Sequence, residues 1–203
     1  GIEIVNPSKS SNLDKYAELL FNAREGKINK KTGNPEYATI EDAKNYILKD
    51  RTMFGALILK AGDADGFVSG ACHSTANTMR PAFQIIKTAP GAKLVSTFFL
   101  MIVPNCEYGH NGMFAFGDCA IEQNPEPEKL ASIAASTCES FKTLVGVEPI
   151  AAMLSHSTMG SASHEHVDKV VEAVRIAKEE YPEYTIDGEL QLDAAIVPSV
   201  ASS

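Results

Sequence analysis

The sequence lacks any apolar run long enough to cross a bilayer. Its most apolar stretch, residues 94–103, has half the roughly 20 residues that a membrane-spanning helix needs. This stretch is rich in β-forming residues, which favours a buried strand. The opening residues, Gly-Ile-Glu-Ile-Val, have neither the basic start nor the long apolar region of a secretory signal. We therefore expect no membrane partner and no signal peptide.

Cysteine is also scarce, and its spacing excludes two further classes of protein. The four cysteines, Cys72, Cys106, Cys119 and Cys138, show no paired spacing of the kind that binds zinc. Four cysteines in a chain of this size do not indicate a disulfide framework either. We expect no metal site and a cytoplasmic location. The sequence also has no internal repeat and no low-complexity tract.

The chain has fewer basic than acidic residues. The 18 Lys and Arg residues face 26 Asp and Glu residues, for a net charge of −8. Such a surface repels nucleic acid and anionic lipid, so we expect no nucleic-acid partner. An anionic ligand must be held by local groups. At 203 residues, 44% of them apolar, the chain is long enough for one large domain or two small ones.

Apolar patterning and turn residues predict alternating strands and helices. The expected strands are 2–5, 54–59, 67–69, 94–103, 113–118 and 150–154, and the expected helices are 11–24, 39–49, 74–87, 127–145 and 163–181. This order is typical of right-handed βαβ units and a mainly parallel sheet, hence of the α/β class. In such folds ligands bind at the carboxyl ends of strands.

Two loops at such strand ends are rich in hydroxyl side chains. The first hydroxyl loop, residues 70–81, includes His73, Ser74 and Thr75 and, further on, Arg80. Backbone N–H groups at a helix start, together with hydroxyls, can bind phosphate or another anion. The alternative is simple helix capping by Ser or Thr. Arg80 favours the ligand interpretation because a guanidinium can bind a phosphate with two donors, although a surface ion pair is also common.

The second hydroxyl loop, residues 154–162, follows another predicted strand. Its candidate ligand residues are Ser155, Ser157, Thr158, Gly160 and Ser161. Capping of the next helix requires only one hydroxyl and leaves the others unexplained. We therefore predict that this loop also contacts an anionic ligand.

The other polar clusters are better explained as ordinary turns and helix starts than as metal or catalytic sites. Residues 62–66 resemble part of a calcium loop, but Ser74 stands where a bidentate glutamate is needed. His164 and His166 are two residues apart and so do not share a helix face. No Gly-x-Ser-x-Gly elbow marks a nucleophilic serine. Glu189 and Asp193 would share a face if 187–193 were helical, either as an ordinary acidic helix start or in a supporting or hinge role.

With these residues considered, the sequence resembles the phosphate acetyltransferase (phosphotransacetylase) family over nearly its whole length. The stretches that carry the resemblance are Gly62–Ala71, His73–Thr75, Met79–Pro81, Gln84–Thr88, Val103–Gly109, Ala152–Ser155, Ser157–Thr158, Gly160–Ala162 and Ile186–Gln191.

The resemblance implies a reaction, a fold and an assembly. The reaction is acetyl-CoA plus phosphate giving acetyl phosphate plus CoA, reversibly, with CoA as a substrate and no tightly bound cofactor. The fold is α/β, three-layer αβα with mainly parallel sheets, in two domains with the active site in the cleft between them. The assembly is a homodimer. Residues 1–90 would be the C-terminal part of the first domain, and 91–203 most of the second.

The resemblance also assigns residue roles. Arg80, in its Thr-x-Arg-Pro context, matches an active-site arginine, and His73, Ser74 and Thr75 match a loop lining the same cleft. In the family, an aspartate acts as base toward the CoA thiol, and a serine and arginines stabilise developing charge, without an acyl-enzyme.

One departure from the family bears on completeness. The family's Ser-Arg-Gly segment, its downstream aspartate and its first strands have no counterpart here, so we expect a central portion of a longer chain. Two alternatives stay open: a non-catalytic module that senses acetyl-CoA, as in fusions to malic enzymes, and a phosphate butyryltransferase.

Overall fold

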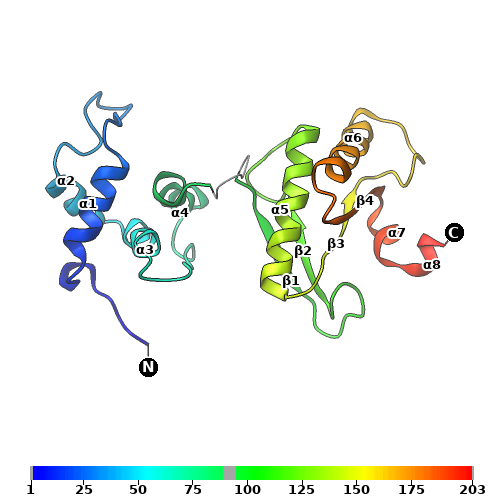
Figure 1. The fold of residues 1–203 in the computed structure, drawn as a ribbon, viewed down its shortest axis with the longest axis horizontal. Helices are drawn as coiled ribbons and strands as arrows, with labels where there is room; N and C mark the ends of the chain where they lie inside the picture. Colours follow the sequence, from blue (N-terminus) through cyan, green and yellow to red (C-terminus); the bar gives the residue numbers. More distant parts are fainter. Residues whose placement is uncertain (1, 89–94, 203) are drawn as a thin grey trace. The chain divides into compact units, whose positions relative to one another are not determined.

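The computed structural model describes residues 2–88 and 95–202. The chain divides into two compact units, Gly1–Pro90 and Gly91–Ser203 (Figure 1). Each unit has its own hydrophobic core. None of the helices within the described ranges is long and apolar enough to cross a membrane.

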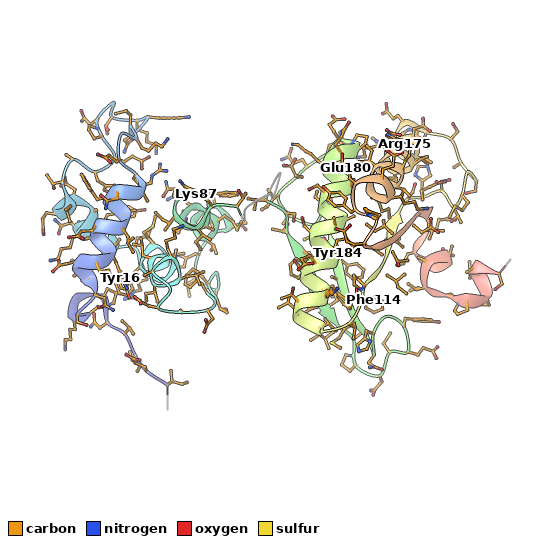
Figure 2. The ribbon with its side chains drawn as sticks, in the orientation of Figure 1. Tyr16, Lys87, Phe114, Arg175, Glu180 and Tyr184 are labelled. Atoms are coloured by element: carbon orange, nitrogen blue, oxygen red, sulfur yellow. The ribbon has the colours of Figure 1, made fainter. Side chains whose placement is uncertain are left out.

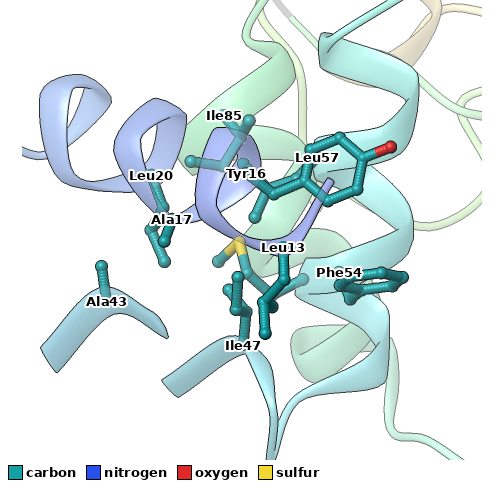
Figure 3. Close-up of a cluster of buried hydrophobic side chains, with 10 residues drawn as sticks. Leu13, Tyr16, Ala17, Leu20, Ala43, Ile47, Phe54, Leu57 and Ile85 are labelled. Atoms are coloured by element: carbon teal, nitrogen blue, oxygen red, sulfur yellow. The ribbon is translucent and has the colours of Figure 1, made fainter. Parts of the chain in front are cut away.

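The first unit is built from helices. They are α1 (Leu13–Ala23), α2 (Ile40–Ile47), α3 (Arg51–Lys60) and α4 (Thr75–Pro81), with short helical turns at Pro7–Lys9 and Ala82–Ile86. Apolar side chains from α1, α2, α3 and the turn Ala82–Ile86 meet in one core (Figure 3): Leu13, Tyr16, Ala17, Leu20, Ala43, Ile47, Met53, Phe54, Leu57 and Ile85. This burial is the main stabilising contribution available to the unit.

Two helices of this unit confirm the sequence predictions closely. Helix α1 lies within the predicted 11–24. Helix α2 begins after Thr39, whose Oγ1 accepts the Asp42 N–H at 3.2 Å while the Thr39 N–H donates to the Asp42 carboxylate at 2.9 Å. This reciprocal capping box satisfies two N–H groups that helix starts leave unpaired.

The strand predicted at 54–59 is wrong, because these residues belong to α3. Asp50 caps this helix by accepting the Met53 N–H at 2.9 Å. Half of the ten helical residues are buried, including Phe54 and Leu57, so the apolar residues show no single stripe. A short apolar run of this kind does not distinguish a strand from a buried helix.

The strands predicted at 2–5 and 67–69 are also wrong. Residues 2–5 have no regular secondary structure and are exposed, with Ile2 96% exposed, and they pair with no strand among the described residues. At 67–69 the backbone is irregular, and the Phe67 ring covers Gly55, where a Cβ atom would come within 2.3 Å of the ring. Both segments have β-forming side chains but no partner strand in this unit, and an isolated strand is not stable.

The second unit alternates strands and helices. Its elements are β1 (Phe98–Ile102), β2 (Met113–Gly117), α5 (Pro127–Val145), β3 (Ile150–Leu154), α6 (Glu165–Glu180), β4 (Thr185–Leu190), α7 (Leu192–Ile196) and α8 (Pro198–Ala201). The predictions of β2, β3, α5 and α6 are confirmed to within two residues at their ends. The prediction of a buried strand over 94–103 is only partly right. Strand β1 covers only Phe98–Ile102 and is largely exposed, with Ile102 66% exposed, and residue 94 lies outside the described residues. Gly146 ends α5 in the left-handed conformation that favours glycine.

The sheet pairing in this unit is mixed. Strands β3 and β4 pair in parallel around the crossover helix α6, as the βαβ interpretation predicts. Strands β1 and β2 instead pair antiparallel, Phe98 opposite Gly117, so the prediction of mainly parallel sheets does not extend to them. The two strands are joined by only about ten residues, which is too short for the crossover helix that parallel pairing needs.

Helices α5 and α6 supply most of the second core. The two helices pack with Met153 of β3 and Ile186 of β4. The buried residues that the helices contribute are Ala131, Cys138, Val170, Ala173, Val174, Ile176 and Ala177. Burial raises the pKa of the Cys138 thiol to about 11, so this thiol is unreactive. At one end of β4 the Tyr184 hydroxyl donates to Glu139 of α5 at 2.5 Å. On α6, Arg175 bridges Glu172 and Glu179. Figure 2 labels Tyr184 and Arg175 among the side chains of this unit.

Between β2 and β3 lies an open, largely apolar cavity of about 1060 Å³. The residues that line it include 113–118, which comprise β2 and the residue after it. Residues 149–155, which comprise β3 and one residue on each side, and side chains of α5 also line it. Within the described residues β2 pairs only with β1, and β3 only with β4. The facing edges of β2 and β3 therefore lack the strand partners that a continuous sheet would give them.

The helix considered for 187–193 is replaced by a strand followed by a helix. Residues 185–190 form β4, and α7 begins only at Leu192. Glu189 and Asp193 therefore do not share a helix face. The β-branched Thr185 and Ile186 and the pairing with β3 favour the extended conformation here.

Candidate functional site

The predicted residues of the first hydroxyl loop lie on an exposed turn that starts α4. The Ser74 Oγ caps the helix by accepting the Asn77 N–H at 3.3 Å, and the His73 N–H donates to the Gly70 carbonyl at 3.2 Å. His73, Ser74 and Thr75 are all exposed. Within the described residues, neither His73 nor Thr75 forms a side-chain hydrogen bond, so both side chains are accessible to a ligand.

Arg80 lies in the last turn of α4 and is exposed. Its Nη2 donates to the Asn77 Oδ1 at 3.1 Å, which links the guanidinium to the residue that Ser74 caps. Among the described residues Arg80 forms no ion pair with a carboxylate. Its remaining N–H donors can therefore bind an anion with the two-donor geometry that a guanidinium provides.

Tyr46 of α2 is the residue beside the Arg80 guanidinium. Burial raises the pKa of the Tyr46 hydroxyl, and its hydrogen bond to Asp50, at 2.9 Å, raises it further, whereas Arg80 works against both effects. Arg80 therefore lies near the neutral hydroxyl of Tyr46, whose proton is already donated to Asp50.

The second hydroxyl loop follows β3 and has a buried centre. Ser157 is 0% exposed, and its Oγ donates to the Glu189 Oε1 at 3.0 Å and accepts the Ala162 N–H at 3.1 Å. By contrast, Gly160 and Ser161 are exposed, and Ser155 and Thr158 are half-buried. The Thr158 Oγ1 donates to the Gln191 Oε1 at 3.2 Å and accepts the Gln191 N–H at 3.0 Å.

Glu189, which the sequence analysis left between an acidic helix start and a supporting or hinge role, lies beneath this loop. Glu189 is 4% exposed, and its Oε1 accepts the Gly160 N–H at 2.7 Å as well as the Ser157 hydroxyl. The hydrogen bond from Gly160 is the largest cause of the lowered pKa of Glu189, with Ser157 adding to it and burial opposing it. The carboxylate is therefore charged at neutral pH.

A local irregularity in the parallel pair explains why the sequence pattern does not reveal Glu189. Met153 pairs with Gly188 but Leu154 pairs with Leu190, so Glu189 is an extra residue in β4. Such a bulge breaks strict alternation and changes the direction of a side chain. As a result Ile186 and Glu189, three residues apart, are both buried. In the sequence Glu189 is one of two acidic residues in a six-residue segment, and only its burial distinguishes it from the exposed Asp187.

Each hydroxyl loop is a local feature of its own unit. His73, Ser74, Thr75 and Arg80 come together on and before α4 in the unit Gly1–Pro90. Ser155, Ser157, Thr158, Gly160 and Ser161 come together with Glu189 at the ends of β3 and β4 in the unit Gly91–Ser203. Both loops thus form within their own unit.

Histidines near the second hydroxyl loop make contacts with one another. The rings of His156 and His164 are 6.0 Å apart between centroids, and those of His164 and His166 are 4.9 Å apart. The His164 Nδ1 accepts the His166 N–H at 3.2 Å, which caps α6. In the part of the chain that the structure describes, no group of three His, Cys, Asp or Glu side chains is arranged to hold a metal ion.

Comparison with curated proteins finds close relatives of one kind. The chain is 55% identical over 199 residues to the phosphate acetyltransferase of Thermoanaerobacterium thermosaccharolyticum, covering 98% of this chain and 58% of that relative. It is 51% identical over 203 residues to the phosphate acetyltransferase of Acetivibrio thermocellus, covering all of this chain and 58% of that protein. The chain therefore spans 58% of the length of these relatives.

Solved structures agree with the sequence relatives. The EutD phosphotransacetylase from Staphylococcus aureus matches with a TM-score of 0.81 and 41% identity, over 100% of this chain and 57% of that chain. A phosphotransacetylase from Streptococcus pyogenes matches with a TM-score of 0.78 and 43% identity, over 98% of this chain and 56% of that chain. The family profile described as phosphate acetyl/butaryl transferase matches residues 1–203, and this chain belongs to that family.

Proposed function

We propose that this chain forms part of a phosphate acetyltransferase, which transfers an acetyl group reversibly between CoA and inorganic phosphate. The observation that carries the proposal is the 55% identity to a curated phosphate acetyltransferase over 98% of the chain. This identity extends over nearly the whole chain and therefore over both units.

The reaction requires a nucleophile to be brought to a thioester carbonyl. A phosphate oxygen attacks the carbonyl carbon of acetyl-CoA, the new C–O bond forms, and the C–S bond breaks. The electron pair of that bond leaves with the CoA sulfur, which takes up a proton. The protein's task is to hold a dianion beside the carbonyl and to stabilise the oxyanion that develops there.

We assign the phosphate to the first hydroxyl loop. Arg80 would bind two phosphate oxygens, and the hydroxyls of Ser74 and Thr75 and the ring of His73 would complete the contact. Support comes from their exposure and from the free donors of the guanidinium. Local donors are needed because a net charge of −8 opposes the approach of an anion. Ser155, Thr158, Gly160 and Ser161 would contact CoA or phosphate, with Ser157 beneath them.

The wider architecture belongs to the same proposal. In it, residues 1–90 complete the first of two three-layer αβα domains, residues 91–203 make most of the second, and the substrates bind in a cleft between them. The enzyme would be a cytoplasmic homodimer that uses CoA as a substrate and holds no cofactor tightly.

The test is CoA-dependent synthesis of acetyl phosphate by the full-length gene product. We expect the unaltered protein to turn over and Arg80→Ala to lose about 100-fold in kcat/KM, the usual cost of a lost transition-state donor. Arg51→Ala, an exposed arginine at the start of α3, is the matched control and should keep full activity. An Arg80→Ala variant with unchanged kinetics would contradict the site assignment.

The same assay separates the alternatives. The family description covers both acetyl and butyryl transfer, so rates on acetyl-CoA and butyryl-CoA should be compared directly. Faster turnover of butyryl-CoA would replace acetyl transfer by butyryl transfer. Binding of acetyl-CoA by calorimetry without any turnover would replace the enzyme by a sensor module.

A further inference from the structure

In the second hydroxyl loop, the backbone N–H groups of Ser155 and of residues 157–162 are already paired inside the protein. The Ser155 N–H donates to the Leu190 carbonyl at 2.9 Å, and the Met159 N–H to the Glu189 carbonyl at 3.1 Å. Loop hydroxyls accept three more, from Ser157, Thr158 and Ala162. The Ser161 N–H donates to Thr158, and the Gly160 N–H to the Glu189 carboxylate.

This arrangement has the form of an anion site whose anion is part of the chain. Two donors converge on one carboxylate oxygen: the Ser157 hydroxyl at 3.0 Å and the Gly160 N–H at 2.7 Å. Hydrogen bonds to an ionised acceptor are about twice as strong as neutral ones. Within the described residues no lysine or arginine forms an ion pair with Glu189, so these hydrogen bonds compensate its buried charge.

The consequence for a substrate is restrictive. A phosphate entering this loop finds no N–H free between residues 157 and 162, and it meets a fixed negative charge beneath the surface. Coulomb repulsion between two like charges is strongest where water is excluded. The hydroxyls of Ser155 and Ser161 are among the groups that can still donate outward.

We propose that Glu189 is a positioning residue that fills the anion site of the second hydroxyl loop and fixes the loop from within. Resting on the proposed function, this divides the work between the loops. The first hydroxyl loop, with Arg80, takes the charge of the phosphate, and the second offers a rigid, uncharged surface of hydroxyls to the rest of the substrates.

Chemical rescue tests the proposal. Glu189→Ala removes the carboxylate and leaves space for a small anion at the Ser157 and Gly160 donors. We expect the Gly160 amide to lose at least tenfold in hydrogen-exchange protection in this variant of the full-length protein. Formate at tens of millimolar should restore it, and chloride at equal ionic strength should not. Glu183→Ala, an exposed glutamate before β4, is the matched control and should change nothing.

A second variant guards against failure of the first to fold. Glu189→Gln keeps a carbonyl oxygen where both donors converge but removes the charge, so the Gly160 amide should stay protected while its proton resonance moves upfield. Native protection at Gly160 in Glu189→Ala, or a loss that formate does not restore, overturns the proposal. So does an unmoved Gly160 resonance in Glu189→Gln. These readouts do not depend on acetyl transfer, whose failure would appear separately as absent turnover in the unaltered protein.

Discussion

The two hydroxyl loops look alike in sequence and differ in structure. In the first, His73, Thr75 and Arg80 are exposed and keep donors free, and only Ser74 is used as a cap. In the second, nearly every polar group is paired internally, around the buried carboxylate of Glu189. A run of serine and threonine after a strand therefore does not by itself predict a ligand site. Such a loop can bind an external anion only if no carboxylate of the chain itself, such as that of Glu189, already occupies its donors.

Arg80→Lys sharpens this comparison with the largest expected effect. A lysine keeps the charge but loses the planar pair of donors, so we expect kcat/KM for phosphate to fall by roughly 10- to 100-fold. Because Arg80 is exposed and forms no ion pair within the described residues, the unfolding midpoint should not change. Steady-state kinetics and thermal melts of the full-length protein check both parts, and a lysine variant with normal kinetics would break the assignment of charge to the first loop.

Ser157→Ala tests the other side of the comparison. The change removes a buried donor to Glu189 and an acceptor for the Ala162 N–H, so we expect the free energy of unfolding to fall by about 1–3 kcal/mol. Ser163→Ala, an exposed serine just after the loop, is the control and should stay within about 0.5 kcal/mol. Urea unfolding of both variants measures the difference, and equal stabilities would show that the buried hydroxyl has no special role.

Ser74→Asp separates capping from ligand binding in the first loop. Aspartate caps helices about as well as serine, so stability should stay within about 0.5 kcal/mol. The added negative charge should nevertheless weaken binding of inorganic phosphate by about tenfold, because it lies beside the proposed site. Calorimetric titration with phosphate measures this. Unchanged affinity would indicate that phosphate binds elsewhere.

The smallest expected effect is the pH dependence of stability that the Glu189 carboxylate of the second loop produces. The folded pKa of Glu189 lies below its ordinary value, so its charge stabilises the fold above that ordinary value, about 4.3. This contribution is lost as the pH falls through the folded pKa. The stability difference between the unaltered protein and Glu189→Gln should therefore be constant near neutrality and shrink below about pH 4. Thermal melts of both proteins from pH 3 to 7 check this. A stability difference that grows in acid would contradict the lowered pKa of Glu189.

The amount that could be predicted from sequence differed between the units for physical reasons. Pro127, the 3.6-residue apolar period and Gly146 define α5 through local chemistry that needs no tertiary partner. Residues 54–59 lack such signals, because a helix buried on most sides has no polar face to mark its period. At 2–5, β-forming residues have no partner strand among the described residues, and pairing is a long-range property that local sequence does not encode.

The candidate site shows the same limit. Arg80 and the exposed hydroxyls could be found because their residue types carry the chemistry. The place of Ser157 and Glu189 could not, since it depends on one extra residue in β4 opposite Met153 and Leu154. A single-residue shift of this kind changes which side chains face inward and leaves the composition of the segment unchanged.

The apolar cavity between β2 and β3 has a consequence for handling these 203 residues as a separate polypeptide. Two strand edges with unpaired backbone groups flank it, and exposed Ile150 and Leu154 lie on one of them. Edges of this kind recruit extended segments from neighbouring molecules. Preparations of the isolated polypeptide should form oligomers that grow with concentration and disperse in mild urea, and charged substitutions at Ile150 should keep them monomeric.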